Sequence, residues 1–224
     1  MIMDDYIKTL TIAFEKNANV KNAVGQKAYM RNQFEFYGMT SPLRKEVQKL
    51  WLNKASLPSK TKLENIVRTL WLKPQREFQF FAQELTFKYA KQFEIKDIAL
   101  IEFMITHKSW WDTVDYIAAN LLGTYFKLYP EQRQIYVKIW LASGNFWLQR
   151  SAILFQLKYK DQVDTEMLSH VITSLLGSKE FFINKAIGWM LREYSKTNPS
   201  WVVNFAERHK LEKLSQKEAL KLIK

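Results

Sequence analysis

The sequence repeats itself at an interval of about 34 residues, and this interval constrains the fold more than any other feature. Residues 147–153 (Trp-Leu-Gln-Arg-Ser-Ala-Ile) resemble residues 181–187 (Phe-Phe-Ile-Asn-Lys-Ala-Ile). Small residues inside aromatic, apolar segments recur at intervals of 36, 34 and 34 residues, at Ala82, Ala118, Ala152 and Ala186. A small side chain at a fixed place lets neighbouring helices approach closely. The period predicts stacked pairs of helices, whose curvature creates an extended concave surface.

Composition and periodicity favour helices in the rest of the chain as well. Gly and Pro together account for 11 of the 224 residues, whereas average usage is about 12%, so we expect few turns. Apolar residues recur at helical spacing, as in Tyr6, Ile7, Leu10 and Phe14, in Leu63, Ile66 and Leu70, and in Phe78, Phe81, Leu85 and Tyr89. We therefore expect an all-α protein, a right-handed solenoid of antiparallel, HEAT-like helix pairs with a basic concave face. No linker is visible, so residues 1–224 are expected to form one domain.

Several helix ends are marked by proline, serine or asparagine. Ser41-Pro42 fits an N-cap followed by Pro at the first helical position. Ser109–Asp112 and Ser215–Glu218 fit capping boxes. Asn198-Pro199 and Tyr129-Pro130 are each expected to end one helix and begin the next.

The chain is strongly basic, with 34 Lys and Arg against 22 Asp and Glu, a formal charge of +12, and a pI near 9.6. Together with 8 Trp and 10 Tyr, this charge favours a nucleic-acid partner. An anionic membrane surface and a merely basic soluble protein are the alternatives. The apolar windows Ile98–Ile105 and Phe181–Leu191 are too short, or interrupted by Lys185, to span a bilayer. The first residues lack the basic start of a signal peptide, so we expect a cytoplasmic protein.

The most unusual stretch is residues 108–115, Lys-Ser-Trp-Trp-Asp-Thr-Val-Asp. Trp111 and Asp115 are four residues apart and share one face of a helix. An aromatic plane beside a carboxylate suits a cationic ligand. The alternative for Asp115 is an exposed helix residue paired with a lysine. Trp110 is expected in the core, and Asp112 as a cap.

Two further stretches carry candidate functional residues. Arg150 lies early in the very apolar segment 145–158, where it suits either a phosphate contact or an intramolecular pair with a carboxylate. Gly188 and Trp189 lie in the middle of the helical segment 178–193. Glycine there costs about 1 kcal/mol relative to alanine, so we expect another helix or a ligand to approach closely. Trp189 fits a core or a cleft equally well.

Many familiar site chemistries are absent from the sequence. There is no Cys, which excludes disulfides, thiolate zinc sites, iron–sulfur clusters and a cysteine nucleophile. His107, His170 and His209 are too far apart for a metal-ligand motif, and no P-loop, dinucleotide fingerprint or nucleophile elbow occurs. We expect neither a metal nor a cofactor. The enzymatic option that these exclusions leave is a reaction on a nucleic acid that uses carboxylate, tryptophan, arginine and lysine side chains.

Three long motifs, at residues 108–115, 147–160 and 179–194, resemble those of the bacterial AlkD-type DNA alkylation repair glycosylases. The resemblance runs over nearly the whole chain and includes Tyr29-Met30, Ser41-Pro42 with Arg44-Lys45, and Leu70-Trp71 ahead of residues 74–78. It implies a HEAT-like solenoid. It also implies hydrolytic removal of cationic alkylpurines, such as 3-methyladenine and 7-methylguanine, from duplex DNA.

The resemblance also implies roles for individual residues. Asp115 and Trp111 match the family's catalytic Asp and Trp, and Trp189 matches the other aromatic wall of the cleft. Arg150 matches a basic residue that holds the DNA backbone, and Tyr29 matches a cleft residue. We expect further DNA contacts from Lys158, Lys185, Arg192, Arg44 and Lys45, and a monomeric protein.

The chemistry expected of these residues is simple. An alkylated purine that carries a positive charge is already a good leaving group, so no general acid is required. Asp115 is expected near C1′, where it would stabilise the cationic sugar. No lysine is placed as a Schiff-base nucleophile, which predicts a monofunctional enzyme. Two alternatives remain open: a noncatalytic repeat protein that binds distorted or branched DNA, and a scaffold for a protein or membrane partner.

Overall fold

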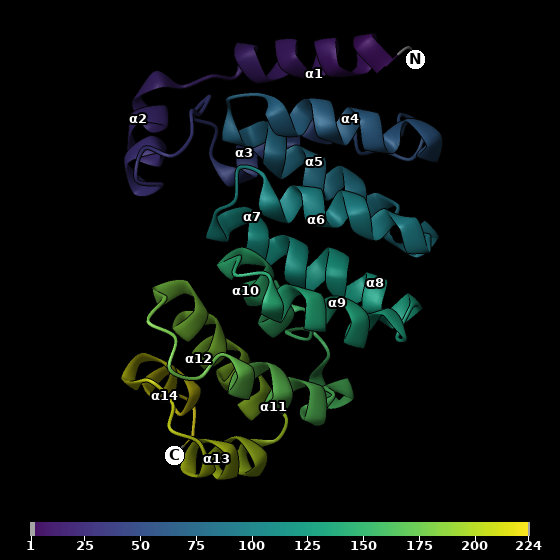
Figure 1. The fold of residues 1–224 in the computed structure, drawn as a ribbon. Coiled ribbons are helices and arrows are strands. Elements are labelled where there is room, and N and C mark those ends of the chain that lie inside the picture. The colour runs from purple at the N-terminus through teal and green to yellow at the C-terminus, as the bar shows by residue number, and fades with distance from the viewer. Residues whose placement is uncertain (1–2, 224) are drawn as a thin grey trace. The chain divides into compact units, whose positions relative to one another are not determined.

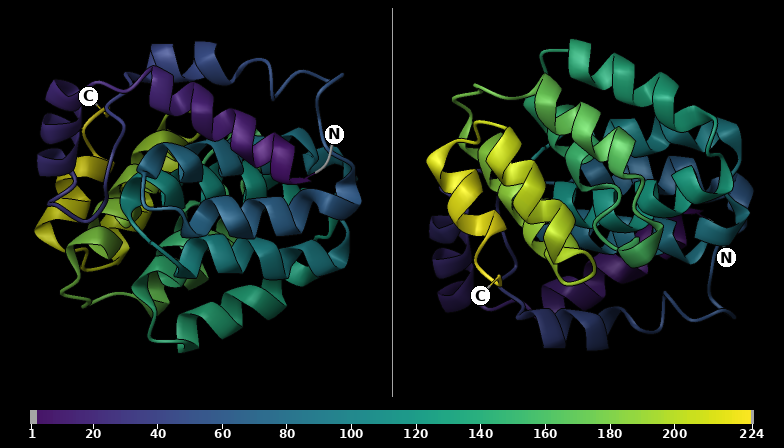
Figure 2. Two further views of the ribbon diagram at one scale, coloured as in Figure 1. Left: turned by 90° about the horizontal axis from the view of Figure 1, so that it is seen from above. Right: turned by 90° about the horizontal axis from the view of Figure 1, so that it is seen from below.

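A computed structural model describes residues 3–223 of the chain, with side chains from Asp5 onward. Within this range the protein is helical, and β-pairing is limited to one isolated bridge between Glu35 and Gln75. The chain forms two compact units, of which the first runs to Gln92 and the second begins at Phe93. In each unit helices stack against helices (Figures 1 and 2). The prediction of an all-α fold is confirmed, whereas a single domain over residues 1–224 stays a prediction.

The first unit is built around the pairing of two long helices. Its elements are α1 (Met3–Lys16), α2 (Val20–Tyr29), α3 (Ser41–Gln48), α4 (Lys60–Leu72), α5 (Arg76–Lys88) and the 3₁₀ turn η1 (Ala90–Gln92). Helix α4 packs along α5, and α1 packs on α3 and α4. Buried Phe14 lies 5.4 Å from Phe78, ring centre to ring centre. The apolar stripes predicted along α1, α4 and α5 form this core.

A buried carboxylate fixes the loop between α2 and α3. Glu77 is 1% exposed and accepts hydrogen bonds from the backbone N–H groups of Tyr37 at 3.1 Å and Gly38 at 2.9 Å. Gly38 has φ +89°, and a Cβ there would lie 2.0 Å from the Asn19 carbonyl oxygen. Only glycine fits this position. The loop is held in this way even though α2 itself buries no side chain.

The second unit is also built from packed helices, most of them short. Its elements are η2 (Ile95–Asp97), α6 (Ile98–Thr106), α7 (Trp111–Tyr116), the π-helical segment η3 (Ile117–Leu122), α8 (Gly123–Leu128), α9 (Gln132–Ala142), α10 (Phe146–Leu154), η4 (Lys160–Gln162), α11 (Thr165–Ser174), α12 (Phe181–Ser195), α13 (Pro199–Arg208) and α14 (Lys213–Ala219). Helix α10 packs against α7, α9 and α12, and α12 packs against α13 and α14.

The sequence repeat corresponds to helices that pack side by side. Residues 147–153 lie in α10 and residues 181–187 begin α12, and these two helices are in contact. The small residues Ala152 and Ala186 are buried, as are Ala82 and Ala118. The expected role of the small residues, to allow helices to approach closely, agrees with this burial.

Two of the expected helix ends are confirmed. Asn198 caps α13, with its side chain accepting from the Trp201 N–H at 3.1 Å, and Pro199 is the first residue of the helix. Tyr129-Pro130 separates α8 from α9. Of the described helices, none is long and apolar enough to cross a membrane.

The serine caps are wrong, because each serine is used differently. Helix α3 begins at Ser41 itself, with Thr40 in the N-cap position. Helix α7 begins at Trp111 with Trp110 as N-cap, and the Ser109 hydroxyl donates to the Ile105 carbonyl at 2.5 Å. Ser215 lies inside α14, where its hydroxyl donates to the carbonyl of Asn184 on α12 at 2.8 Å. For Ser215, a hydrogen bond to α12 therefore takes the place of the expected cap.

Candidate functional site

Asp115 and Arg150 form a buried ion pair in the second unit, where α7 meets α10. Arg150 Nε donates to Asp115 Oδ1 at 2.7 Å, and Arg150 Nη2 donates to Asp115 Oδ2 at 2.9 Å. The Arg150 side chain is 3% exposed and that of Asp115 is 15% exposed. The partner of Asp115 is therefore a buried arginine, not the surface lysine that the sequence left as an alternative.

The same guanidinium also reaches α12. Arg150 Nη1 donates to the backbone carbonyl of Phe182, in the first turn of that helix. One side chain thus connects α7, α10 and α12, which carry the three motifs singled out in the sequence. Nε and Nη2 of Arg150 hold the two oxygens of Asp115, so Arg150 orients that carboxylate. A direct contact of Arg150 with a DNA phosphate stays a prediction and would require the guanidinium to leave these partners.

The environment of Asp115 acts on its charge in two directions. Burial raises the pKa of the Asp115 carboxyl above its ordinary value, and nearby Asp112 adds to the rise. The hydrogen bonds and positive charge of Arg150 oppose that rise. Arg150 is thus the group that favours the ionised form of Asp115 in a partly desolvated site.

The two candidate tryptophans lie on different helices, Trp111 on α7 together with Asp115 and Trp189 on α12. Trp111 is one turn before Asp115 on α7, and it is partly exposed, as is Trp189 on α12. Trp110 instead packs in an aromatic cluster, with its ring centre 5.8 Å from Trp147 and 5.3 Å from Phe182. Trp110 is nevertheless partly exposed and is not among the buried core residues, so it lies at the edge of the core and not in its interior.

The backbone on either side of α7 is irregular. Lys108 has φ +49°, a left-handed conformation that non-glycine residues rarely adopt. Immediately after α7 the helix widens into the π-helical segment η3. Such segments are rare and occur frequently at functional sites. Neither feature has a sequence signal that predicts it. Lys158, which is exposed, donates to Asn120 of this segment at 2.7 Å.

Lys185 and Arg192, both expected to contact DNA, share a carboxylate that sequence reasoning missed. Glu218 of α14 accepts from Lys185 Nζ at 2.8 Å and from Arg192 Nη1. Gly188, which lies between them on α12, makes the approach possible, since a Cβ there would lie 2.6 Å from the Glu218 Cβ. The close approach expected at Gly188 is that of a helix. Ser215 and Glu218 have the spacing of a capping box, and for that reason the sequence does not predict that Glu218 binds Lys185 and Arg192.

The candidate residues of the first unit differ in exposure. Tyr29, at the end of α2, is 70% exposed, and Lys45 of α3 is exposed. Arg44 is 6% exposed and donates to Glu84 and to Gln48, each at 2.8 Å. The structure therefore gives Arg44 an intramolecular partner, and its contact with DNA stays a prediction.

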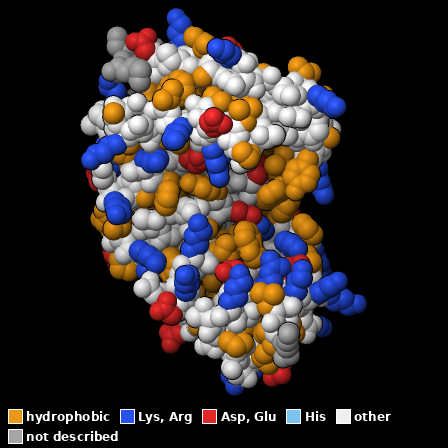
Figure 3. Space-filling view, turned by 180° about the vertical axis from the view of Figure 1, so that it is seen from behind, with side chains coloured by type: hydrophobic (Ala, Val, Ile, Leu, Met, Phe, Trp, Pro, Cys, Tyr) orange, Lys and Arg blue, Asp and Glu red, His pale blue; other side chains and the backbone are white. Residues whose placement is uncertain are grey.

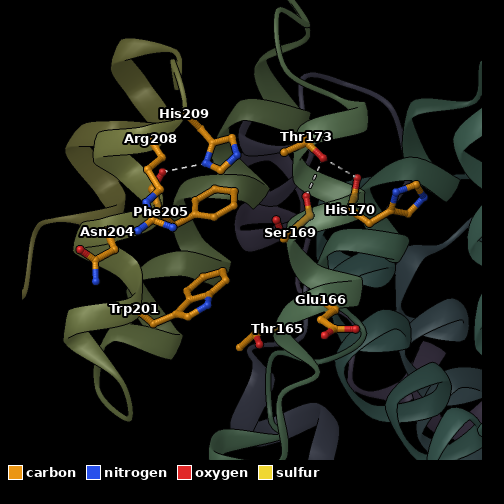
Figure 4. A pocket seen from close by; sticks show the side chains of 10 residues that line it. All are labelled: Thr165, Glu166, Ser169, His170, Thr173, Trp201, Asn204, Phe205, Arg208 and His209. Carbon is orange, nitrogen blue, oxygen red and sulfur yellow. Dashed lines mark hydrogen bonds between the residues drawn. The ribbon is translucent and has the colours of Figure 1, made fainter.

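A hollow of about 580 Å³ lies between α11 and α13 (Figure 4). The rings of Trp201 and Phe205 are stacked at 5.0 Å along α13, and His209 continues the stack at 4.2 Å from Phe205. His170 comes from α11 on the other side. None of the site residues expected from the sequence lines it.

Charge is distributed over the surface and not gathered into a metal-binding cluster. Figure 3 shows Lys and Arg side chains over much of the face in view, with apolar side chains between them. Among the described residues, no group of three or more His, Asp or Glu side chains is placed to hold a metal ion.

Comparisons with known proteins point to one family. The profile of the family described as "DNA alkylation repair enzyme" matches residues 10–223. A solved structure described as a "Predicted DNA alkylation repair enzyme from Enterococcus faecalis" is similar, with a TM-score of 0.86 and 32% sequence identity. That match covers 92% of this chain and 96% of the other. No curated protein sequence matches this chain.

Proposed function

Because the chain belongs to the DNA alkylation repair enzyme family, we propose that it is a DNA glycosylase that hydrolyses the N-glycosidic bond of cationic alkylated purines in duplex DNA. The observation that carries this proposal is the Asp115 carboxylate, buried, oriented by Arg150 and one helical turn from Trp111. A carboxylate beside an aromatic ring suits a site where positive charge develops.

The chemistry of the substrate explains how little the site needs. A purine alkylated at N3 or N7, such as 3-methyladenine or 7-methylguanine, carries a positive charge and leaves as a neutral base. No proton has to be donated to it. The task of the enzyme is therefore to stabilise the sugar as it becomes cationic and to supply water to C1′.

Asp115 accelerates the reaction if it interacts more strongly with the cationic sugar than with the cationic base of the ground state. A charge pair at about 4 Å in a medium of effective dielectric near 20 contributes about 4 kcal/mol. If about 3 to 4 kcal/mol of this is specific to the transition state, the rate rises by two to three decades. Arg150 holds both carboxylate oxygens in place beforehand, so little reorganisation is needed.

The remaining candidate residues are proposed to hold the DNA. Trp111 and Trp189 would flank the deoxyribose, where their ring faces favour its cationic form. Lys45 and Lys158 are exposed and are proposed phosphate contacts, and exposed Tyr29 a contact near the lesion. Since no lysine is assigned as a Schiff-base nucleophile, the enzyme is proposed to be monofunctional. We propose that it acts as a monomer in the cytoplasm.

The decisive experiment measures free base released from a duplex with one 7-methylguanine under single-turnover conditions. Wild type and Asp115→Asn are compared at matched DNA occupancy, after thermal unfolding shows that both are folded. We expect release by wild type and a loss of about two to three decades in the variant. Binding without release by either protein would instead establish a noncatalytic protein that recognises DNA by shape.

A further inference from the structure

Glu218 is the one carboxylate that the described contacts place on both Lys185 and Arg192. It accepts from Lys185 Nζ at 2.8 Å and from Arg192 Nη1, and its side chain is 15% exposed. The two cations are seven residues apart on α12, so they lie two turns apart on the same face. Their side chains are 39% and 25% exposed and border on solvent.

The fold holds Glu218 in this position through its backbone. Gly188 lies between the two cations, and the missing side chain lets α14 press against α12. The Ser215 hydroxyl, one turn before Glu218, donates to the Asn184 carbonyl at 2.8 Å. The hydrogen bond from Lys185 is the first cause that lowers the pKa of Glu218 below its ordinary value, which shows that the ionised form is the one these contacts stabilise.

A carboxylate and a phosphate make the same kind of charge-assisted hydrogen bond with lysine and arginine. While Glu218 holds these cations, they neutralise few phosphates and so displace few of the counterions condensed on the DNA. We propose that Glu218 competes with DNA phosphates for Lys185 and Arg192, and thereby lowers the affinity of the protein for any duplex, damaged or undamaged. The inference rests on the proposed function, because it requires that the protein bind DNA.

The test measures binding of an undamaged duplex by fluorescence anisotropy at several salt concentrations. Each phosphate contact contributes about −0.9 to the slope of log K against log salt concentration. We expect Glu218→Gln to bind several-fold more tightly at low salt, with a slope steeper by about 0.9 to 1.8. An unchanged affinity and slope, or weaker binding by a variant that still unfolds cooperatively, would overturn the inference.

A double-mutant cycle makes the test independent of net charge. Lys185→Gln and Arg192→Gln should change wild-type binding little, but should remove the gain when combined with Glu218→Gln. Equal losses in the two backgrounds would show that the cations contact DNA whether Glu218 is present or not, which contradicts competition. If Glu218→Gln does not fold, Glu218→Ala takes its place in the same cycle, because it also removes the carboxylate from both cations.

Glu193→Gln is the matched control, since it removes the same charge from a carboxylate of α12 that pairs with Lys196 at 2.6 Å. It should reproduce none of the effect. If no variant binds duplex DNA, the proposed function fails together with this inference. If wild type binds DNA and releases 7-methylguanine while Glu218→Gln behaves as wild type, only the inference fails.

Discussion

The guanidinium of Arg150 holds both carboxylate oxygens of Asp115, at 2.7 and 2.9 Å, across the contact between α10 and α7. The pair is buried and bidentate, so it positions the carboxylate firmly. It also makes each partner dependent on the other, because a charge left alone in this environment is costly.

Arg150→Ala should lower the free energy of unfolding by about 3 to 5 kcal/mol, because it leaves the Asp115 carboxylate buried without its partner. Urea denaturation measures this. The double variant Asp115→Asn, Arg150→Met removes both charges and should be more stable than Arg150→Ala alone. If the double variant is the less stable of the two, the loss comes from packing and not from the unpaired charge.

The pH dependence of base release should show the ionisation of Asp115. Burial raises its pKa in the folded protein, so the rate should fall as the pH drops through a value above 3.8, the ordinary pKa. Arg150 opposes the rise, and Arg150→Met should therefore move this acid limb to higher pH. Single-turnover rates across pH, restricted to the range in which both proteins stay folded, test the direction. A shift to lower pH would contradict the assignment of Asp115.

Gly188→Ala should destabilise the protein by about 1 to 3 kcal/mol, although alanine is the better helix former. The new Cβ would meet the Glu218 Cβ at 2.6 Å and the Ser215 carbonyl oxygen at 2.9 Å. Gly25→Ala is the matched control, because nothing lies within 4 Å of a Cβ at that helical position. It should raise stability by about 0.4 to 1 kcal/mol. Thermal or urea unfolding should therefore show that the two substitutions change the free energy of unfolding in opposite directions.

Lesion charge should decide which bases are released. 7-Methylguanine, which is cationic, should be released at a measurable rate, whereas hypoxanthine, which is neutral, should be released slowly or not at all. The physical reason is that the site offers stabilisation of the sugar cation but no identified acid to protonate a neutral base. Parallel single-turnover assays on two duplexes of otherwise identical sequence test this. Rapid release of hypoxanthine would require an acid that the proposed mechanism lacks.

Long-range periodicity was predictable from the sequence, and side-chain pairing was only partly so. The match between residues 147–153 and 181–187 identified two helices that pack together. Trp111 and Asp115 were recognised as sharing a helix face from their spacing alone. The pairing of Asp115 with Arg150 was open, because both an exposed and a buried partner satisfied the same local pattern. Tertiary contact decided between them.

The predictions from sequence that were wrong or missing also have physical causes. Ser215 and Glu218 have capping-box spacing, but in the structure both side chains bind residues of α12. A local rule cannot see a neighbour that lies about 30 residues away in the chain. The π-helical segment after α7 has no distinctive composition. Whether Tyr29, Lys45 and Lys158 contact DNA depends on a partner that the sequence does not contain.

The interval of the repeat also sets an order of charges. Asp115, Arg150, Lys185 and Glu218 follow one another at intervals of 35, 35 and 33 residues, on α7, α10, α12 and α14. They pair as neighbours, Asp115 with Arg150 and Lys185 with Glu218. Helix α10 packs against both α7 and α12, yet Arg150 pairs with the carboxylate on α7, because the residue at the matching place on α12 is Lys185, which carries a like charge. The order of charges along this row therefore distinguishes one neighbouring helix from another. Apolar contacts between similar helices do not make that distinction.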